Sequence, residues 1–340
     1  MKIIYPLAFF LLFQFFSACD RSLELPQTSQ SSPLTDSQQI QKRNKAGTPN
    51  IVFRFTDGGQ TWQNISEGLP KPVKDDYGVG RNVISYDNGL WLIAGNSIYH
   101  SNSNSKAPFW KKEIFPGEHS SISPGNSRIF AYNYWGGILQ KTNGMGIWSP
   151  VFTNFKEKRI RSVFETAGGT IFIDTDRGLF KSTDSGKTWK TLFTGGLGKK
   201  VESNGVLIAT SAEGILRSTD DGENWNWVIK EGGVGIDVEN IEGGFAAITF
   251  NTQSKTRRVR TSYDSGKTWQ PIDAGLPASS SISSIVQLGE NLFCGHPDGI
   301  YQSSDKGKSW KRILCPMDGK VFNLSVSGNV IYAILKNGGC

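Results

Sequence analysis

The chain has few of the residues that build metal sites and nucleophilic sites, with only 3 histidines and 4 cysteines among its 340 residues. The histidines, His100, His119 and His296, are dispersed, and no histidine or cysteine pair has the spacing of metal ligands. No nucleophile motif and no glycine-rich phosphate loop occurs. The sequence therefore predicts neither a metal site nor a bound cofactor.

A helical period is also missing, since apolar residues nowhere recur convincingly at three- and four-residue spacing. Short apolar runs alternate instead with turns rich in glycine, which the chain contains 39 times. Residues 161–165, 170–174, 179–182 and 188–192 form one such set of four runs. Short strands separated by turns in this way indicate an all-β fold.

Tryptophan marks a repeat along the chain, at spacings that average about 41 residues, the length of one four-stranded propeller blade. The seven positions are Trp62, Trp110, Trp148, Trp189, Trp225, Trp269 and Trp310. Residues 50–340 hold seven such periods with almost nothing left over. We therefore expect a single seven-bladed β-propeller with no second domain, and a monomeric ring.

Most of these tryptophans close an octet that reads Ser-x-Asp-x-Gly-x-x-Trp. The octet is complete at residues 182–189, 218–225, 262–269 and 303–310, lacks its serine at residues 55–62, and is degraded at Trp110 and Trp148. The aspartate can accept backbone N–H groups of a tight turn, the glycine allows a positive φ, and the tryptophan packs under the hairpin. We assign a structural role to Asp57, Gly59, Trp62, Asp184, Gly186, Trp189, Asp220, Gly222, Trp225, Asp264, Gly266, Trp269, Asp305, Gly307 and Trp310, with calcium binding by the aspartates as the alternative.

The octet resembles the Asp-box, or BNR repeat, of sialidases, tandem-propeller xyloglucan hydrolases, sortilin-type receptors and photosystem II assembly factors. This resemblance implies a folding device on the rim, away from the working face. A sialidase would carry an Arg-Ile-Pro motif, which is absent here. The xyloglucan hydrolases usually place their site between two propellers, whereas one is expected here. The assembly factors fit better in length, in the single ring, in the export signal and in the arginine-rich face.

The two ends of the chain supply complementary halves of one blade. Residues 321–327 and 330–335 read as two inner strands, while residues 51–54 and 61–63 read as two outer strands. We expect these N- and C-terminal strands to share the closing blade, which leaves no open sheet edge at the junction.

The first nineteen residues resemble a bacterial lipoprotein signal. Lys2 precedes an apolar run over residues 3–16, and Ser17-Ala18-Cys19 follows. The resemblance implies a signal peptide over residues 1–18, lipidation of Cys19 and a disordered Ser/Gln/Pro-rich tether over residues 19–49. It also implies a lipid-anchored location in the bacterial cell envelope, facing the periplasm or the outside. An ordinary cleaved signal or a short membrane anchor is the alternative.

Export would place the remaining cysteines in an oxidising compartment. Cys294 lies within an apolar strand and is expected to be buried. Cys315 and Cys340 should lie on the same face, and we hypothesise a disulfide between them that pins the C-terminus.

The face opposite the octets carries the links between blades and the loops between second and third strands. Basic residues are frequent there, and the chain has a net charge of +7. The expected binding residues on this face are Arg81, Tyr134, Trp135, Arg159, Arg161, Arg177, Lys199, Lys200, Arg257, Arg258 and His296. An acidic partner would suit such a face, but scattered solvated lysines are the alternative, and nucleic acid does not suit an exported lipoprotein.

These observations favour a non-catalytic, membrane-tethered platform that binds a protein or an acidic glycan through its basic face. The alternative is a glycoside hydrolase, because two carboxylates across the channel could serve as acid and base. Its candidate residues are Asp176, Glu213 and Asp298, which come from corresponding loops of three blades.

Overall fold

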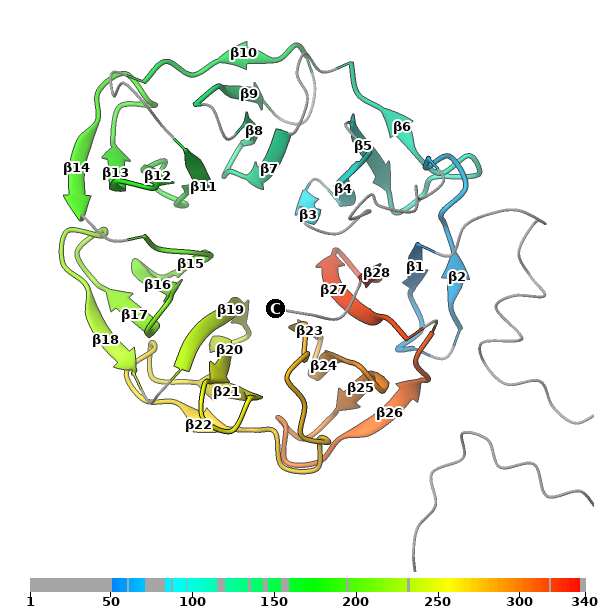
Figure 1. Ribbon diagram of the computed structural model, residues 1–340. Helices are drawn as coiled ribbons and strands as arrows, with labels where there is room; N and C mark the ends of the chain where they lie inside the picture. Colours follow the sequence, from blue (N-terminus) through cyan, green and yellow to red (C-terminus); the bar gives the residue numbers. More distant parts are fainter. Residues whose placement is uncertain are drawn as a thin grey trace, which may run out of the picture.

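The computed structural model describes residues 51–59, 61–70, 83–86, 88–95, 97–114, 120–133, 136–142, 146–153, 159–193, 196–230, 233–317 and 319–336. These residues form seven four-stranded antiparallel sheets arranged in a ring (Figure 1). The predicted seven-bladed β-propeller is thus confirmed. In the described part of the chain, no helix is long and apolar enough to span a bilayer.

Six blades are continuous in sequence, and each is named here by its strands. Two of them are β3 (Val83–Tyr86), β4 (Gly89–Ala94), β5 (Ser97–Asn102) and β6 (Lys111–Lys112), then β7 (Ser120–Pro124), β8 (Arg128–Asn133), β9 (Ile138–Thr142) and β10 (Ser149–Pro150). The next two are β11 (Ile160–Glu165), β12 (Ile171–Thr175), β13 (Gly178–Ser182) and β14 (Lys190–Phe193), then β15 (Lys200–Ser203), β16 (Val206–Ser211), β17 (Gly214–Ser218) and β18 (Asn226–Ile229). The last two are β19 (Gly233–Ile241), β20 (Gly244–Asn251), β21 (Thr256–Ser262) and β22 (Gln270–Pro271), then β23 (Ser284–Leu288), β24 (Asn291–His296), β25 (Gly299–Ser303) and β26 (Lys311–Leu314).

The seventh sheet has the order β2-β1-β28-β27 and combines the two ends of the described chain. It contains β1 (Val52–Phe55), β2 (Gln63–Asn64), β27 (Val321–Ser327) and β28 (Val330–Lys336). Strand β1 pairs antiparallel with β28, so that Phe53 lies opposite Ala333. The ring is therefore closed by main-chain hydrogen bonds between its first and last strands.

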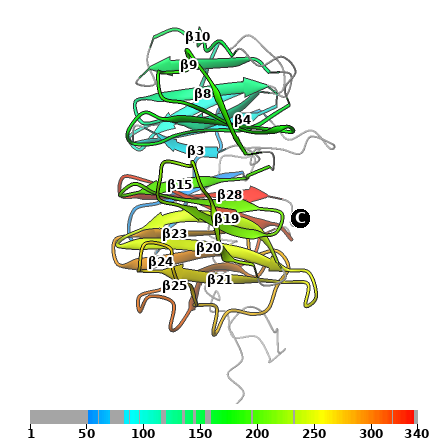
Figure 2. The same ribbon diagram turned by 90° about the vertical axis from the view of Figure 1, so that its left-hand side faces the viewer.

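Each blade packs both of its faces against neighbouring blades, as the stacked sheets in Figure 2 show. All five residues of β12 are buried, and so are the first five of β16. Burial on both faces explains why these strands read as continuous apolar runs rather than as alternating patterns.

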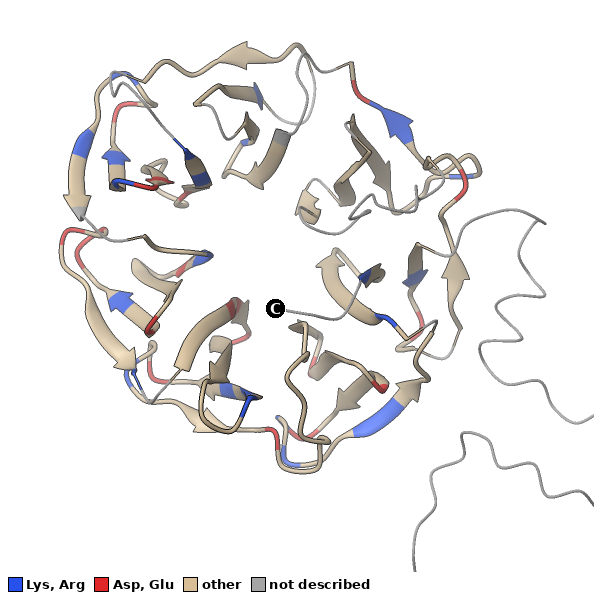
Figure 3. Cartoon of the chain, in the orientation of Figure 1, with Lys and Arg blue, Asp and Glu red and all other residues tan. Residues whose placement is uncertain are grey.

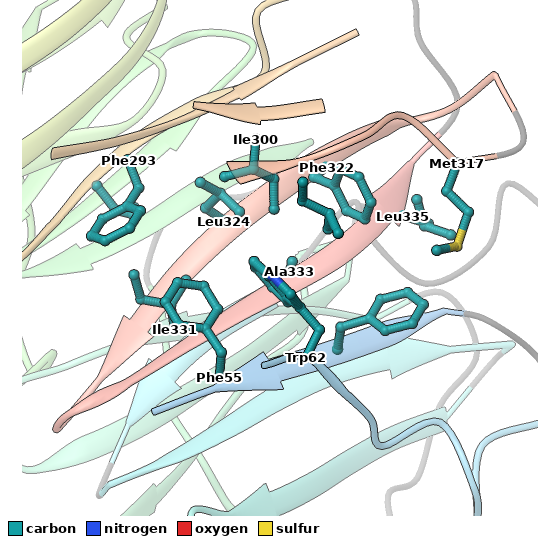
Figure 4. Close-up of a cluster of buried hydrophobic side chains, with 13 residues drawn as sticks. Phe55, Trp62, Phe293, Ile300, Met317, Phe322, Leu324, Ile331, Ala333 and Leu335 are labelled. Carbon is teal, nitrogen blue, oxygen red and sulfur yellow. The ribbon is translucent and has the colours of Figure 1, made fainter. Parts of the chain in front are cut away.

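The interface between the β23–β26 blade and the closing blade shows how the apolar contacts continue across the junction. Figure 4 shows Phe293 and Ile300 of one blade facing Phe322, Leu324 and other side chains of the next. On the outer side of this cluster, Phe55 and Trp62 meet edge to face at 4.2 Å between ring centroids. The two ends of the chain thus share one hydrophobic cluster as well as one sheet.

The complete octets form the turns between third and fourth strands, and the octet at residues 182–189 is typical of them. The Asp184 carboxylate accepts hydrogen bonds from the backbone N–H groups of Lys187 and Thr188, at 3.0 and 2.9 Å. The Ser182 hydroxyl accepts from the N–H of Gly186, which has a φ of +86°. Hydrogen bonds of the same kind hold the pKa of Asp220 and of Asp305 at about 2. These aspartates therefore serve as acceptors within their own turns.

The octet tryptophans use two different acceptors. The indole N–H groups of Trp189, Trp225 and Trp269 donate to the carbonyl of the glycine in the same octet. The indole of Trp189 also donates to the carbonyl of Phe152, just after β10 of the preceding blade, at 3.3 Å. The indole of Trp310 donates to the carbonyl of Ile272 in the preceding blade, at 2.6 Å. These two octets thus also connect neighbouring blades.

Candidate functional site: a central cavity lined by both signs of charge

A cavity of about 1090 Å³ occupies the middle of the ring. Its wall is built largely by the inner strands β3, β7, β11, β15, β19 and β27. Many of the lining residues have short side chains, among them Ser123, Gly125, Ser162, Gly196, Gly198 and Ser283. The charged side chains that reach the cavity therefore determine what it can bind.

The wall of the cavity carries both signs of charge. The cations on the wall are Arg161, Lys199, Lys200, Arg257 and Lys336, and the carboxylates are Glu165, Asp174, Glu202, Asp237 and Glu239. Figure 3 likewise shows both signs of charge around the ring, with neither gathered on one side. Glu165, Glu202, Asp237 and Glu239 come from inner strands, whereas Asp174 comes from the second strand of its blade.

Lys199 shows how this pairing works. Its ammonium lies 2.9 Å from a carboxylate oxygen of Asp237 and also forms an ion pair with Glu239. Desolvation opposes the charge, but the two carboxylates outweigh it and raise the pKa of Lys199. Lys199 is therefore neutralised by the neighbouring blade and does not provide a free positive charge.

Asp174 is a buried carboxylate on the wall, at the next-to-last position of β12, and its exposed fraction is 1%. One oxygen accepts a hydrogen bond from the backbone N–H of Leu197 at 3.2 Å, while Oδ2 has no hydrogen-bond partner. Burial raises the pKa of Asp174 to about 6, although the positive charge of Lys200 opposes the shift. Asp174 thus retains an unused acceptor within the cavity.

Lys200, the first residue of β15, is one of two cations whose charges lower the pKa of Asp174, and Arg161 is the other. Its ammonium donates to the carbonyl of Gly198 at 3.0 Å and to the hydroxyl of Ser162 at 3.3 Å. An ammonium has three N–H donors, so one remains available. Burial lowers the pKa of Lys200 to about 8, and the Asp174 carboxylate opposes this change.

Arg161 lies on the cavity wall near the start of β11 and is exposed. Its guanidinium forms no ion pair or hydrogen bond with another of the residues that the structure describes. Strand pairing places Ile160 opposite Thr175, so Arg161 and Asp174 lie at the same end of their strands. That end is opposite the octet turns. Nearby, Tyr132 is buried and hydrogen-bonded to Ser123, and burial raises its pKa to about 12.

The three carboxylates considered for catalysis lie in loops, and none of them contributes to the cavity wall. Asp176 lies 3.9 Å from Arg159, and Glu213 is exposed in the loop between β16 and β17. Asp298 donates its backbone N–H to Nδ1 of His296. The His296 ring is itself buried, its Nε2 lies 2.9 Å from the carbonyl of Pro277, and burial lowers its pKa.

The other expected binding residues fall into separate places. Arg257 lines the cavity, is almost buried, and donates to the carbonyl of Ile282 at 2.6 Å. Arg258 is exposed and pairs with Asp273, and Arg177 is exposed. Arg81, Tyr134 and Trp135 lie outside the described residues.

Among the described residues, one cysteine has a free thiol and one forms a disulfide. Cys294 is free and buried, and burial raises its pKa, whereas Cys315 is disulfide-bonded. Cys340 and the expected lipidation site Cys19 lie outside the described residues, so the Cys315–Cys340 pairing stays a prediction. The expected signal peptide and tether, residues 1–18 and 19–49, lie outside them as well. In the described ranges, no three His, Cys, Asp or Glu residues are grouped as metal ligands.

Comparison with known sequences gives one limited similarity. No protein-family model matches the chain. A stretch of 155 residues is 24% identical to the xyloglucanase Xgh74A of Acetivibrio thermocellus, and it covers 43% of this chain and 15% of the xyloglucanase. The chain therefore corresponds to a small part of that protein.

Comparison with solved structures confirms the propeller fold. A structure of YCF48 bound to D1 peptide has a TM-score of 0.54 and 14% identity, over 85% of this chain and 98% of that chain. The GH74 xyloglucanase from Xanthomonas campestris has a TM-score of 0.58 and 14% identity, over 83% of this chain and 54% of that chain. At these identities the similarity shows the fold alone.

Proposed function

We propose that this protein is a non-catalytic binding platform, tethered to a membrane through a lipid on Cys19, that docks a partner protein at the cavity end opposite the octets. The observation that carries this proposal is the state of the carboxylates on the cavity wall. Each of those described has an internal partner, and two buried oxygens lack a hydrogen bond: Glu165 Oε1, which forms an ion pair with Arg128, and Asp174 Oδ2, which does not. A platform needs a shaped, charged surface, whereas a hydrolase needs two carboxylates free to act.

The occupied carboxylates are held by strong contacts. Glu165 pairs with Arg128 at 3.1 Å and accepts the N–H of Asn126. Glu202 accepts the backbone N–H groups of Ala167 and Gly205. Glycoside hydrolysis uses a pair of carboxylates that flank the scissile bond. With Asp237 and Glu239 bound to Lys199, the described wall leaves Asp174 without a catalytic companion.

Two further observations support a protein as the partner. Arg161 is exposed at the cavity end and forms no hydrogen bond or ion pair in the described chain, although its charge lowers the pKa of the nearby Asp174, so it can pair with a carboxylate of a docked protein. YCF48, whose solved structure contains a bound D1 peptide, has a single propeller that matches over nearly its whole length. An acidic glycan is the other partner class that the sequence suggests.

The second candidate function is glycoside hydrolysis, which the sequence similarity to a xyloglucanase favours. In that case Asp176, Glu213 and Asp298 are candidates only if their loops come together over the cavity mouth. The matched stretch covers 15% of the xyloglucanase, so a complete active site need not be shared.

The test is crosslinking of the tagged lipoprotein in its native membrane, followed by identification of the captured proteins. We expect a stoichiometric partner with the wild type and with Arg177→Glu, and none with Arg161→Glu. Arg177 is the matched control, because it is an exposed arginine on the same face that does not line the cavity. Hydrolysis of a glycan by the same preparation, without any partner, would contradict the proposal.

A further inference from the structure

The cavity wall contains three charged groups with unused hydrogen-bonding capacity at one end. Asp174 has a free acceptor, Lys200 has a free donor, and the Arg161 guanidinium, whose charge acts on Asp174, forms no hydrogen bond or ion pair in the described chain. All three line the same cavity and are supplied by two neighbouring blades. We propose that Arg161, Lys200 and Asp174 form a binding site for a hydroxycarboxylate, the chemistry of a uronic acid residue.

The proposed ligand follows from what each group lacks. Arg161 and Lys200 need an anionic acceptor, and a carboxylate can take hydrogen bonds from both. Asp174 Oδ2 is buried without a partner, so it needs a hydrogen-bond donor. A hydroxyl next to the carboxylate provides this donor in the same molecule.

Simpler ligands satisfy the site less well. A phosphate dianion carries twice the charge of a carboxylate and would be repelled more strongly by the ionised Asp174. A neutral sugar would leave the Arg161 charge without a counterion, and acetate would leave Asp174 Oδ2 without a donor. The hydroxycarboxylate is the ligand that meets all three requirements together.

The segment that joins β14 to β15 preorganises the site. Within it, the backbone N–H of Leu197 holds Asp174 and the carbonyl of Gly198 holds Lys200. A Cβ atom at Gly198 would lie 2.4 Å from the Thr210 hydroxyl, and one at Gly196 would lie 2.8 Å from the Arg161 guanidinium. Glycine at both positions therefore lets the segment approach the charged groups closely.

Hydroxyl groups around the site favour a sugar acid. Ser123, Ser162, Thr210 and Ser211 line the cavity and can exchange further hydrogen bonds with ligand hydroxyls. A wall of short hydroxyl side chains suits a compact polyhydroxylated ligand.

The test is calorimetric titration of the purified full propeller with D-glucuronate, D-glucose and acetate. We expect glucuronate to bind, and glucose and acetate to bind about tenfold or more weakly, since glucose lacks the carboxylate for Arg161 and Lys200 and acetate lacks the hydroxyl donor for Asp174 Oδ2. Arg161→Gln should weaken glucuronate binding by about tenfold or more. Arg159→Gln is the matched control and should bind like the wild type.

Asp174→Asn tests the buried acceptor, and Arg161→Gln keeps the proposal testable if that variant does not fold. Equal binding of glucuronate by wild type and Arg161→Gln would overturn the inference. Preference for a peptide with a free C-terminal carboxylate over glucuronate would also overturn it. The inference rests on the proposed binding function, but absence of glucuronate binding with partner capture intact would refute it and leave that function standing.

Discussion

The blades with complete octets and the two blades formed by β3–β10 reach the same architecture through different contacts. In an octet, the Ser182 hydroxyl donates to Asp184 and accepts from Gly186, so all partners lie within four residues. In the β7–β10 blade, Lys141 takes the position of that serine. Its ammonium pairs with Glu113 of the preceding blade at 2.7 Å.

Aromatic rings complete this second arrangement. Lys141 lies 5.7 Å from the ring centroid of Trp91 and 5.8 Å from that of Trp148, while Trp91 stacks on His100. Glu113 also lies 3.1 Å from the His100 ring. The serine and aspartate of an octet therefore stabilise a single turn, whereas the Lys141 cluster, made of these five residues, joins two blades. The cluster should be the more sensitive of the two to a single substitution.

The largest effect is expected for Glu113→Ala. The Lys141 and Glu113 side chains are only 8% and 10% exposed, so removing the carboxylate leaves a buried ammonium unpaired. The loss in free energy of unfolding should be about 3–5 kcal/mol, measured by urea denaturation. Replacing both residues, as Glu113→Leu with Lys141→Met, should recover much of it.

The matched control for this prediction is Glu223→Ala. Glu223 pairs with Lys181 and Lys190 between two octet-containing blades, but it is considerably more exposed. Its removal should therefore reduce stability much less. Equal losses for Glu113→Ala and Glu223→Ala would show that burial of the Lys141 cluster has no special importance.

A smaller effect is expected for Ser182→Ala in an octet. The substitution leaves the buried N–H of Gly186 without its acceptor, which should cost about 1–3 kcal/mol. Thr183→Ala, at the exposed neighbouring position, should change stability by less than about 0.5 kcal/mol. Thermal unfolding of the two variants side by side measures the difference. A loss with Ser182→Ala above that of Glu113→Ala would reverse the comparison.

The smallest effect is a dependence on pH that belongs to the octets. Asp220 and Asp305 have pKa values of about 2 in the folded protein, below the ordinary value of about 3.9. A lowered pKa means that their stabilisation is complete above about pH 4 and is lost as pH falls through about 2. The melting-temperature difference between wild type and Asp220→Asn should be constant down to about pH 4 and then shrink. A difference that persists unchanged at pH 2 would contradict this origin.

The ring was predictable from the sequence because its information is local and repeated. The tryptophan spacing defines the blade, and each octet contains the partners that its own turn requires. Even the degraded copy at Trp148 keeps the tryptophan in register, although nothing near Lys141 in the sequence indicates that Glu113 is its partner. The repeat therefore did not predict the contacts between blades.

The charge of the cavity was not predictable for the same reason. Lys199 and its partners Asp237 and Glu239 belong to different blades, and counting basic residues along the links cannot show that they are neutralised. The sequence did indicate that Asp174 is unusual, because it is a charged residue within the buried strand Ile171–Thr175. An acidic residue in a strand that is buried on both faces must be hydrogen-bonded, be paired with a positive charge or have a raised pKa.

The pairing of β1 with β28 has a consequence for the order of folding. The closing sheet cannot form until the last strands of the chain are available, because Phe53 pairs with Ala333, and almost the whole described sequence lies between them. A ribosome-bound or partly translocated chain can complete its six continuous blades but not the ring. Until β28 emerges, the apolar side chains of the first strands remain uncovered. Protection by a chaperone therefore matters most in the interval between the emergence of β1 and that of β28.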